Sequence, residues 1–319
     1  MKGKLFHAGL VLACILWISP QVQALVPGGD VVGIELSDGT VTVAAIDETL
    51  GQNARQAGLL EGDTILRVDE KEVSSAQDVR RILERSDGTV ELEVLRDGKC
   101  RNLTVRPAVT DQGPKLGIYL RQGVTGVGTV TFYDPETGCF GALGHGVNST
   151  DGELVEMEKG LVYRAAVLSV EKGECGDPGQ LLGTITGEMP IGTLTGNTQR
   201  GIFGKTRQGW AGEDMDICPA DQVQTGPAVI RSTIQDSQVR EYSVEILKLY
   251  PNAGSAGRNM LLRVTDPALL ATTGGIVQGM SGSPIIQDGK LVGAVTHVLV
   301  NDPTTGYGIF IENMLDTAA

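Results

Sequence analysis

The chain has 319 residues, which is enough for about two domains of ordinary size. Hydrophobic residues make up 41% and charged residues 20% of it, so the body of the chain should fold around a core. A formal net charge of −13 argues against nucleic-acid binding, which needs a basic face. With 44 glycines and only 4% aromatic residues, the composition favours short strands and tight turns, and we expect a mainly β protein.

The N-terminus has the pattern of an export signal. Two lysines come first, residues 6–18 are apolar, and Val22-Gln23-Ala24 is a small-residue cleavage site. The apolar run is shorter than the roughly 18 residues of a membrane span. We therefore predict a signal peptide over residues 1–24 and export across the cytoplasmic membrane. An uncleaved signal anchor and lipidation at Cys14 are the alternatives.

The next stretch has the element order of a small α+β domain. Residues 31–46 alternate between apolar and polar types and predict strands, and a short helix is expected to end at Gly58. A second helix is expected from Ser75 to Leu83, with Ser74 or Ser75 as its cap. Two strands joined by a turn at residues 96–99 close the unit.

One run in this stretch resembles protease-associated PDZ domains. It reads Ala57-Gly58-Leu59, followed by Glu61-Gly62-Asp63-Thr64-Ile65-Leu66. The resemblance implies a PDZ domain over residues 25–108, in which a peptide adds as a strand and places its C-terminal carboxylate on a backbone loop. By this likeness the loop is Val32-Gly33-Ile34-Glu35. The alternative is a PDZ-shaped module that docks within its own chain and takes no free peptide.

Residues 109–319 predict a second domain of many short strands, reached through a linker at residues 111–114. Strands are expected at residues 116–120, 126–132, 162–170, 181–186, 228–234, 239–249 and 258–265. Turn signals at this spacing favour a barrel or a sandwich.

The hexapeptide Gly279-Met280-Ser281-Gly282-Ser283-Pro284 precedes an apolar hairpin. A serine flanked by glycines on such a turn holds its hydroxyl clear of the backbone, while neighbouring N–H groups converge on one point. The pattern resembles the nucleophile turn of chymotrypsin-like serine proteases. It predicts Ser281 as nucleophile and the N–H groups of Gly279 and Ser281 as the oxyanion hole. An ordinary Gly-Ser turn between strands is the alternative.

A histidine base must be His145 or His297, because the third histidine of the chain lies in the predicted signal. His145 stands between two glycines at the end of a strand pair, where an imidazole can approach a hydroxyl from another strand. His297 lies in an apolar strand and is expected to line the cleft. We therefore predict His145 as the general base.

A Ser–His pair needs a third group that holds the imidazole tautomer. Asp266 lies at the end of a predicted strand shortly before Ser281. Asp134 and Asp151, on either side of His145, are local alternatives. An Asp-Pro pair at a strand end is also an ordinary turn start, so the sequence alone leaves the third member open.

The cysteines beyond residue 24 are too widely spaced for a metal knuckle: Cys100, Cys139, Cys175 and Cys218. Export permits disulfides, but four cysteines allow three pairings and the sequence does not choose among them. The proposed chemistry requires no metal and no organic cofactor.

Four stretches together resemble the SpoIVB peptidases of spore-forming bacteria: residues 140–145, 273–286, 292–298 and 301–308. The order of signal, PDZ domain and C-terminal peptidase also matches that family. The resemblance implies a chymotrypsin-like β-barrel peptidase domain over residues 109–319. It also implies His145 as base, Ser281 as nucleophile and Asp266 as the third member.

The same resemblance implies a serine endopeptidase exported from the forespore into the space between its two membranes. There it is expected to cleave itself and a membrane-associated regulator of an intramembrane protease, and so to signal to the mother cell. A catalytically silent PDZ scaffold that binds a partner's peptide tail is one alternative. A non-proteolytic hydrolase or acyltransferase with the same triad is another.

Overall fold

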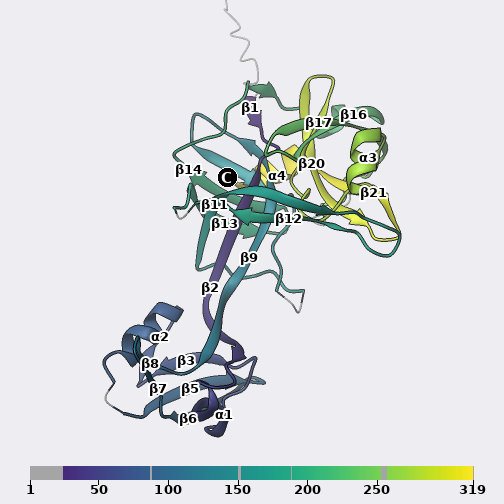
Figure 1. Cartoon of the computed structure of the whole chain (residues 1–319). Helices are drawn as coiled ribbons and strands as arrows, with labels where there is room; N and C mark the ends of the chain where they lie inside the picture. Colours follow the sequence, from purple (N-terminus) through teal and green to yellow (C-terminus); the bar gives the residue numbers. More distant parts are fainter. Residues whose placement is uncertain (1–23, 87, 150–151, 188, 253–256, 319) are drawn as a thin grey trace, which may run out of the picture.

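The computed structural model describes residues 24–86, 88–149, 152–187, 189–252 and 257–318. In this part the chain is built mostly from strands, with four short α-helices, which confirms the expected mainly β class. A smaller body formed early in the chain lies apart from a larger body, and β2 and β9 run between them (Figure 1). Nearly all of the predicted signal over residues 1–24 lies outside the described residues. No helix within the described ranges is long and apolar enough to cross a membrane.

The smaller body is the α+β unit expected from the sequence. Its elements are α1 (Gln52–Gln56), β3 (Thr64–Val68), β4 (Lys71–Glu72), α2 (Ala76–Leu83), β5 (Val90–Arg96), β6 (Lys99–Val105), β7 (Ala108–Thr110) and β8 (Gly113–Lys115). Ser75 caps α2, because its hydroxyl accepts a hydrogen bond from the Asp78 N–H at 3.0 Å. The apolar face of the helix, Val79, Ile82 and Leu83, packs into the core of this body.

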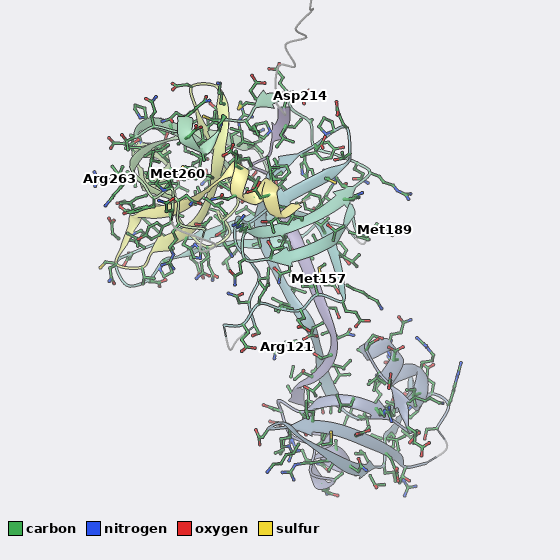
Figure 2. The ribbon with its side chains drawn as sticks, turned by 180° about the vertical axis from the view of Figure 1, so that it is seen from behind. Arg121, Met157, Met189, Asp214, Met260 and Arg263 are labelled. Atoms are coloured by element: carbon green, nitrogen blue, oxygen red, sulfur yellow. The ribbon has the colours of Figure 1, made fainter. Side chains whose placement is uncertain are left out.

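Two long strands belong to both bodies. β2 (Val31–Ile46) and β9 (Ile118–Tyr133) pair with each other from Val31 opposite Thr129 to Ile46 opposite Ile118. Figure 2 shows the same pair of strands from behind, with Arg121 of β9 between the two bodies. The lower halves of both strands continue the sheet of β3, β5 and β6. The smaller body is thus inserted between two strands of the larger one.

This insertion differs from the predicted division, in which the PDZ domain starts at residue 25. β1 (Ala24–Pro27) pairs with β9 and with β15 (Met215–Asp216), and residues 32–37 of β2 pair with β11 (Lys159–Glu171). These strands lie in the larger body. The apolar alternation of residues 31–46 is interrupted only at Ser37-Asp38-Gly39-Thr40, and at this interruption the pairing of β2 passes from β11 in the larger body to β3 in the smaller one.

The peptide loop predicted at Val32-Gly33-Ile34-Glu35 is wrong. These residues lie in the middle of β2, which is paired with β9 on one edge and with β11 on the other. Val32 and Ile34 are almost fully buried. Because strands flank this segment on both sides, no row of free N–H groups is left there to receive a carboxylate.

The first half of the larger body is a closed ring of strands. β9 pairs with β10 (Cys139–Ala142), and β10 pairs with β14 (Gly201–Thr206). β13 (Gly192–Thr198), β11 and β2 then lead back to β9. β12 (Gln180–Ile185) pairs with β11 outside the ring.

The second half is a closed six-stranded barrel. Its strands are β16 (Gly226–Thr233), β17 (Val239–Leu249), β18 (Met260–Val264), β21 (Asp302–Phe310), β20 (Lys290–Leu299) and β19 (Pro284–Gln287). A 3-10 helix (Ala220–Gln222) precedes it, α3 (Pro267–Thr273) lies within it in sequence, and α4 (Ile311–Ala318) follows it. Its core is aliphatic, with Ile230, Ile246, Leu262 and Ile285 fully buried. A strand ring and a barrel side by side confirm the expected chymotrypsin-like architecture.

Candidate active site

The turn that carries Ser281 lies between α3 and β19, where the second barrel meets the first ring. Gly279 and Gly282 have positive φ angles of 95° and 96°, a region that favours glycine. A side chain at position 282 would also clash with the backbone carbonyl of Thr129 on β9. Both glycines of the predicted motif are therefore required by the backbone.

The carbonyl groups of this turn are all held by hydrogen bonds. Their donors come from neighbouring strands and from the turn itself: Leu181 N to Gln278 O at 2.8 Å, Thr129 Oγ1 to Gly279 O at 2.8 Å, Ser283 N to Met280 O at 2.9 Å, Thr129 N to Ser281 O at 3.0 Å, and Thr131 Oγ1 to Gly282 O at 2.8 Å. A turn with every carbonyl held in this way has little freedom to rotate its peptide planes.

The N–H groups of the same turn divide into two sets. Those of residues 278, 280, 282 and 283 each donate to a backbone carbonyl. Those of Gly279 and Ser281 have no acceptor among the described residues. They are the two donors that the sequence predicted for the oxyanion hole, and two unpaired N–H groups beside a serine hydroxyl can bind a developing oxyanion.

The hydroxyl of Ser281 is half-buried and donates to the backbone carbonyl of Thr296 on β20 at 2.8 Å. His297 is the next residue of that strand, and its ring centroid lies 5.1 Å from that of His145. A Cβ at Gly144 would lie 2.9 Å from the Thr296 side chain. The structure therefore brings His145, from the ring, to the segment that holds the Ser281 hydroxyl.

His145 follows β10 and is oriented by a backbone carbonyl. Its Nδ1 lies 2.8 Å from the carbonyl oxygen of Gly146. With Nδ1–H donating there, the other nitrogen, Nε2, is left bare to accept a proton. Burial of the ring lowers the pKa of His145 below its ordinary value of 6.5, and the bond to Gly146 opposes that change only in part.

His297 is the second imidazole of the site and stays neutral at neutral pH. Burial, together with His145 and Arg258 nearby, lowers the pKa of His297 to about 4. Its Nδ1 is buried and has no hydrogen-bond partner in the described part of the chain. The sequence predicted His297 as a wall of the cleft, and the structure places it directly against the predicted base.

The structure does not bring Asp266 to either histidine. Its Oδ1 accepts hydrogen bonds from the N–H groups of Ala268 and Leu269, both at 2.9 Å, so Asp266 is the N-cap of α3. Its Oδ2 lies 3.4 Å from the Ser243 N–H. The Asp-Pro pair that drew attention to this residue is also a helix-start signal, because proline fits the first helical position.

The structure does not place either alternative carboxylate, Asp134 or Asp151, as the third member of the triad. Asp134 accepts hydrogen bonds from Glu136 and Thr137 within its own turn. Asp151 lies outside the described residues. Within the described ranges, the partner that His145 has at Nδ1 is the carbonyl of Gly146 and no carboxylate.

Thr129, Thr131 and Leu181 hold the turn and were missed by the sequence reasoning. The two threonines are fully buried and lie two apart on β9, so they share one face of the strand. The signal in the sequence was a pair of threonines two apart in an apolar strand, which indicates two hydroxyl groups on one face of that strand. Their partners lie about 150 positions further along the chain, which no local pattern shows.

A cavity of about 690 Å³ adjoins the turn over residues 278–283, which we call the oxyanion turn. Gln278 and Gly279 form one side of it, residues 125–127 of β9 a second, and residues 180–185 of β12 a third. None of these lining residues is charged. The cavity can therefore receive an uncharged stretch of polypeptide next to Ser281.

A second groove, of about 430 Å³, lies in the smaller body between α2 and the start of β9. Val79 and Leu83 of the helix face residues 116–120 across it. Its charged lining residues are Arg80 and Lys115, which are positive, and Asp47, which is negative. In this lower part β9 pairs with β2 on one edge only, as far as the chain is described. An apolar groove beside an open strand edge is the arrangement in which a peptide adds as a strand.

The remaining site predictions concern metals and cysteines. No group of three or more His, Cys, Asp and Glu side chains in the described residues could hold a metal ion. The four cysteines at positions 100, 139, 175 and 218 are free thiols here.

Comparison with protein families gives two matches. The model described as SpoIVB peptidase S55 matches residues 112–315, and the PDZ domain model matches residues 30–106.

Curated relatives match over short stretches. A putative zinc metalloprotease, R01501, of Rhizobium meliloti is 31% identical over 98 residues, which cover 30% of this chain and 25% of that protein. A putative zinc metalloprotease of Helicobacter pylori is 35% identical over 60 residues, which cover 19% of this chain and 17% of that protein. The match thus spans a quarter or less of these relatives.

Solved structures match with low scores. The active form of the Rv3671c protease from M. tuberculosis has 14% identity and a TM-score of 0.37, covering 60% of this chain and 72% of that one. The HtrA-type protease AlgW with a decapeptide has 14% identity and a TM-score of 0.38, covering 66% and 57%. The PDZ domain of an SdrC-like protein from Listeria innocua has 22% identity and a TM-score of 0.23, covering 27% and 97%.

Proposed function

Because the chain belongs to the SpoIVB peptidase S55 family, we propose that it is a serine endopeptidase with Ser281 as its nucleophile and His145 as its general base. The observation that carries this is the pairing of the oxyanion turn. Within the turn over residues 278–283, only the N–H groups of Gly279 and Ser281 lack an acceptor, and they lie beside the Ser281 hydroxyl, which is held by the carbonyl of the residue before His297.

The reaction proceeds through an acyl-enzyme. The Ser281 hydroxyl leaves the Thr296 carbonyl, gives its proton to Nε2 of His145, and its oxygen attacks the scissile carbonyl. The N–H groups of Gly279 and Ser281 bind the oxyanion. The protonated His145 then gives its proton to the leaving amine, and water enters by the same steps to release the acid product. The Gly146 carbonyl keeps Nδ1 protonated throughout. It thereby holds the imidazole tautomer, which is one of the two roles of the third residue in a catalytic triad.

The PDZ domain supplies a place for a polypeptide partner. We place the peptide in the groove between α2 and residues 116–120, where it adds to the open edge of β9. Arg80 and Lys115 outnumber the one acidic lining residue, Asp47, and provide positive charge for a C-terminal carboxylate. This replaces the loop at residues 32–35 as the site of peptide capture.

The biological setting is also part of the proposal. The export pattern at the N-terminus and the family resemblance support a peptidase sent from the forespore into the space between its membranes. There it cleaves itself and a membrane-associated regulator of an intramembrane protease, and this cleavage carries a signal during spore formation.

The test uses the full chain with export intact. Wild type and Ser281→Ala protein are expressed separately, mixed, and mapped at their N-termini, and each is treated with a fluorophosphonate. We expect the wild type to be labelled at Ser281 and trimmed, and the variant to be trimmed only when wild type is added. Ser283→Ala, in the same turn, is the matched control and should still be labelled. Identical N-termini in all samples would contradict self-processing, and an unlabelled wild type would contradict Ser281 as nucleophile.

A further inference from the structure

We propose that Thr129 is a positioning residue of the oxyanion hole. The inference rests on the proposed function, since it takes the turn around Ser281 to be the site of acyl transfer. Thr129 does not touch the substrate in this scheme. It acts on the orientation of the two N–H groups that bind the oxyanion.

Thr129 is fully buried and uses three of its atoms to join the two parts of the site. Its Oγ1 donates to the Gly279 carbonyl at 2.8 Å, and its N–H donates to the Ser281 carbonyl at 3.0 Å. Its own carbonyl accepts from the Leu143 N–H at 3.2 Å, two residues before His145. One residue of β9 therefore fixes the nucleophile turn and the approach to the base at once.

The bond to Gly279 matters because this residue is a glycine that lies directly between the peptide planes that lead to the two oxyanion donors. Glycine visits left- and right-handed conformations with similar ease, and Gly279 is held at a φ of 95°. The peptide plane before it is fixed by the bond from Leu181 N to Gln278 O. The plane after it, which joins Gly279 to Met280, is held at its carbonyl by the Thr129 hydroxyl and at the Met280 N–H by the Val277 carbonyl at 3.1 Å. This plane lies between the two that carry the oxyanion donors. With both planes held, the N–H of Gly279 points in one direction. The orientation of the second plane also sets where Met280 begins, and so the direction of the Ser281 N–H.

Thr131 offers a matched control in the same strand. It is equally buried, and its hydroxyl makes the same kind of bond, to the Gly282 carbonyl at 2.8 Å. The peptide plane that it holds joins Gly282 to Ser283 and follows both oxyanion donors, whereas the plane that Thr129 holds lies between them. In both planes the N–H is also paired with a backbone carbonyl. Loss of the Thr131 hydroxyl therefore leaves a buried carbonyl unpaired without releasing either oxyanion donor.

The experiment compares Thr129→Val, Thr129→Ser and Thr131→Val in the full chain. Active sites are counted by complete fluorophosphonate labelling, so that unfolded molecules do not enter kcat. We expect Thr129→Val to lower kcat by about tenfold or more with KM changed by less than about threefold, because removal of one oxyanion donor costs about 10²–10³. A peptide aldehyde, whose adduct places an oxyanion in the hole, should lose affinity for this variant in parallel with kcat/KM.

Two further results are expected. Thr129→Ser, which keeps the hydroxyl, should restore kcat to within about threefold of wild type. Thr131→Val should lose thermal stability much as Thr129→Val does, and its loss of kcat should be clearly smaller than that of Thr129→Val. If valine does not fit at position 129, Thr129→Ala removes the same hydroxyl and repeats the test.

The proposal is overturned if Thr129→Val and Thr131→Val lower kcat equally, or if the aldehyde binds Thr129→Val as tightly as wild type. Failure of the proposed function looks different. In that case the wild type itself is neither labelled nor active, and both proposals fall together.

Discussion

At the residue scale, the unusual feature of the site is a histidine base held by a carbonyl. In a Ser-His-Asp triad the carboxylate holds the tautomer and also stabilises the imidazolium. The Gly146 carbonyl does the first and carries no charge for the second. Beside His145 the structure places a neutral His297, whose own pKa is lowered in part by the charge of Arg258. The bond to the Gly146 carbonyl offsets only part of the burial that lowers the pKa of His145.

This lowered pKa sets the acid limb of the activity. The base works only when it is neutral, so kcat/KM rises as pH rises through the pKa of His145 in the free enzyme. Because burial moves that pKa downward, we expect the midpoint of the acid limb below pH 6.5. A pH profile of kcat/KM on a substrate without titrating groups checks it. A midpoint at or above pH 7 would indicate a carboxylate against the imidazole.

Asp266 permits a second prediction at this scale, because its two possible roles respond differently to asparagine. Asparagine is a good helix N-cap, so Asp266→Asn should keep the stability of wild type, whereas Asp266→Ala should lose about 1 kcal/mol. We expect both variants to retain kcat per labelled site within about threefold. Thermal unfolding and active-site-normalised rates measure this. A loss of about 10⁴ in the asparagine variant at unchanged stability would make Asp266 the third member after all.

At the scale of elements, we expect the outer edge of β9 to guide the substrate. Thr129 directs both its N–H and its carbonyl away from β2, toward Ser281 and Leu143. Backbone groups of alternate residues point to the same edge, so those of Thr125 and Val127 face the same way. These two residues line the cavity beside Gly279. An extended substrate can therefore add as a strand from the oxyanion turn along β9.

Proline at position 127 tests this edge without breaking the sheet. The Val127 N–H points away from β2, so Val127→Pro removes a donor only from the cleft side. We expect KM for a long peptide substrate to rise about tenfold, while a short ester is hydrolysed as by wild type. Thr125→Pro, further from Ser281 on the same edge, should have a smaller effect. An equal loss on the ester would mean that the proline had disturbed the site itself.

At the scale of the whole molecule, the peptide groove and the catalytic turn lie on one strand. Residues 118–120 of β9 line the groove, and residues 129 and 131 hold the Ser281 turn. The PDZ domain is inserted through β2 and β9 rather than attached by a single linker (Figure 1). Two paired strands restrict how far the groove can move from the cleft, so a tail bound in one can present its own chain to the other.

Recruitment by a tail should therefore depend on the charge of the groove. Arg80→Glu reverses one of its cations, and we expect KM for a substrate with a free C-terminal tail to rise about tenfold at unchanged kcat. Arg81→Glu is the matched control, because Arg81 pairs with Asp78 at 3.0 Å and lines a different cavity. Steady-state kinetics on tailed and amidated substrates measure both variants. Equal effects of the two variants would place the tail elsewhere.

The sequence by itself determined the parts of this protein that depend on neighbours in the chain. The Ser75 cap and the apolar face of α2 follow from residues one helical turn apart. The Ser281 turn follows from two glycines and a following hairpin, and it already pointed to the N–H groups of Gly279 and Ser281. His145 followed from the small number of histidines and its glycine neighbours. In each case the physical cause is local backbone geometry.

Only the tertiary structure decided which distant segments meet. An alternating strand fits any sheet, so residues 32–35 could be read as part of the PDZ domain until β9 and β11 were seen on both sides of them. Asp266 was a plausible triad member until its oxygens were found on α3. Thr129 had no visible role until the fold set it against Gly279. Partner choice across such distances depends on how strands twist and close into barrels, which residue type and spacing do not encode.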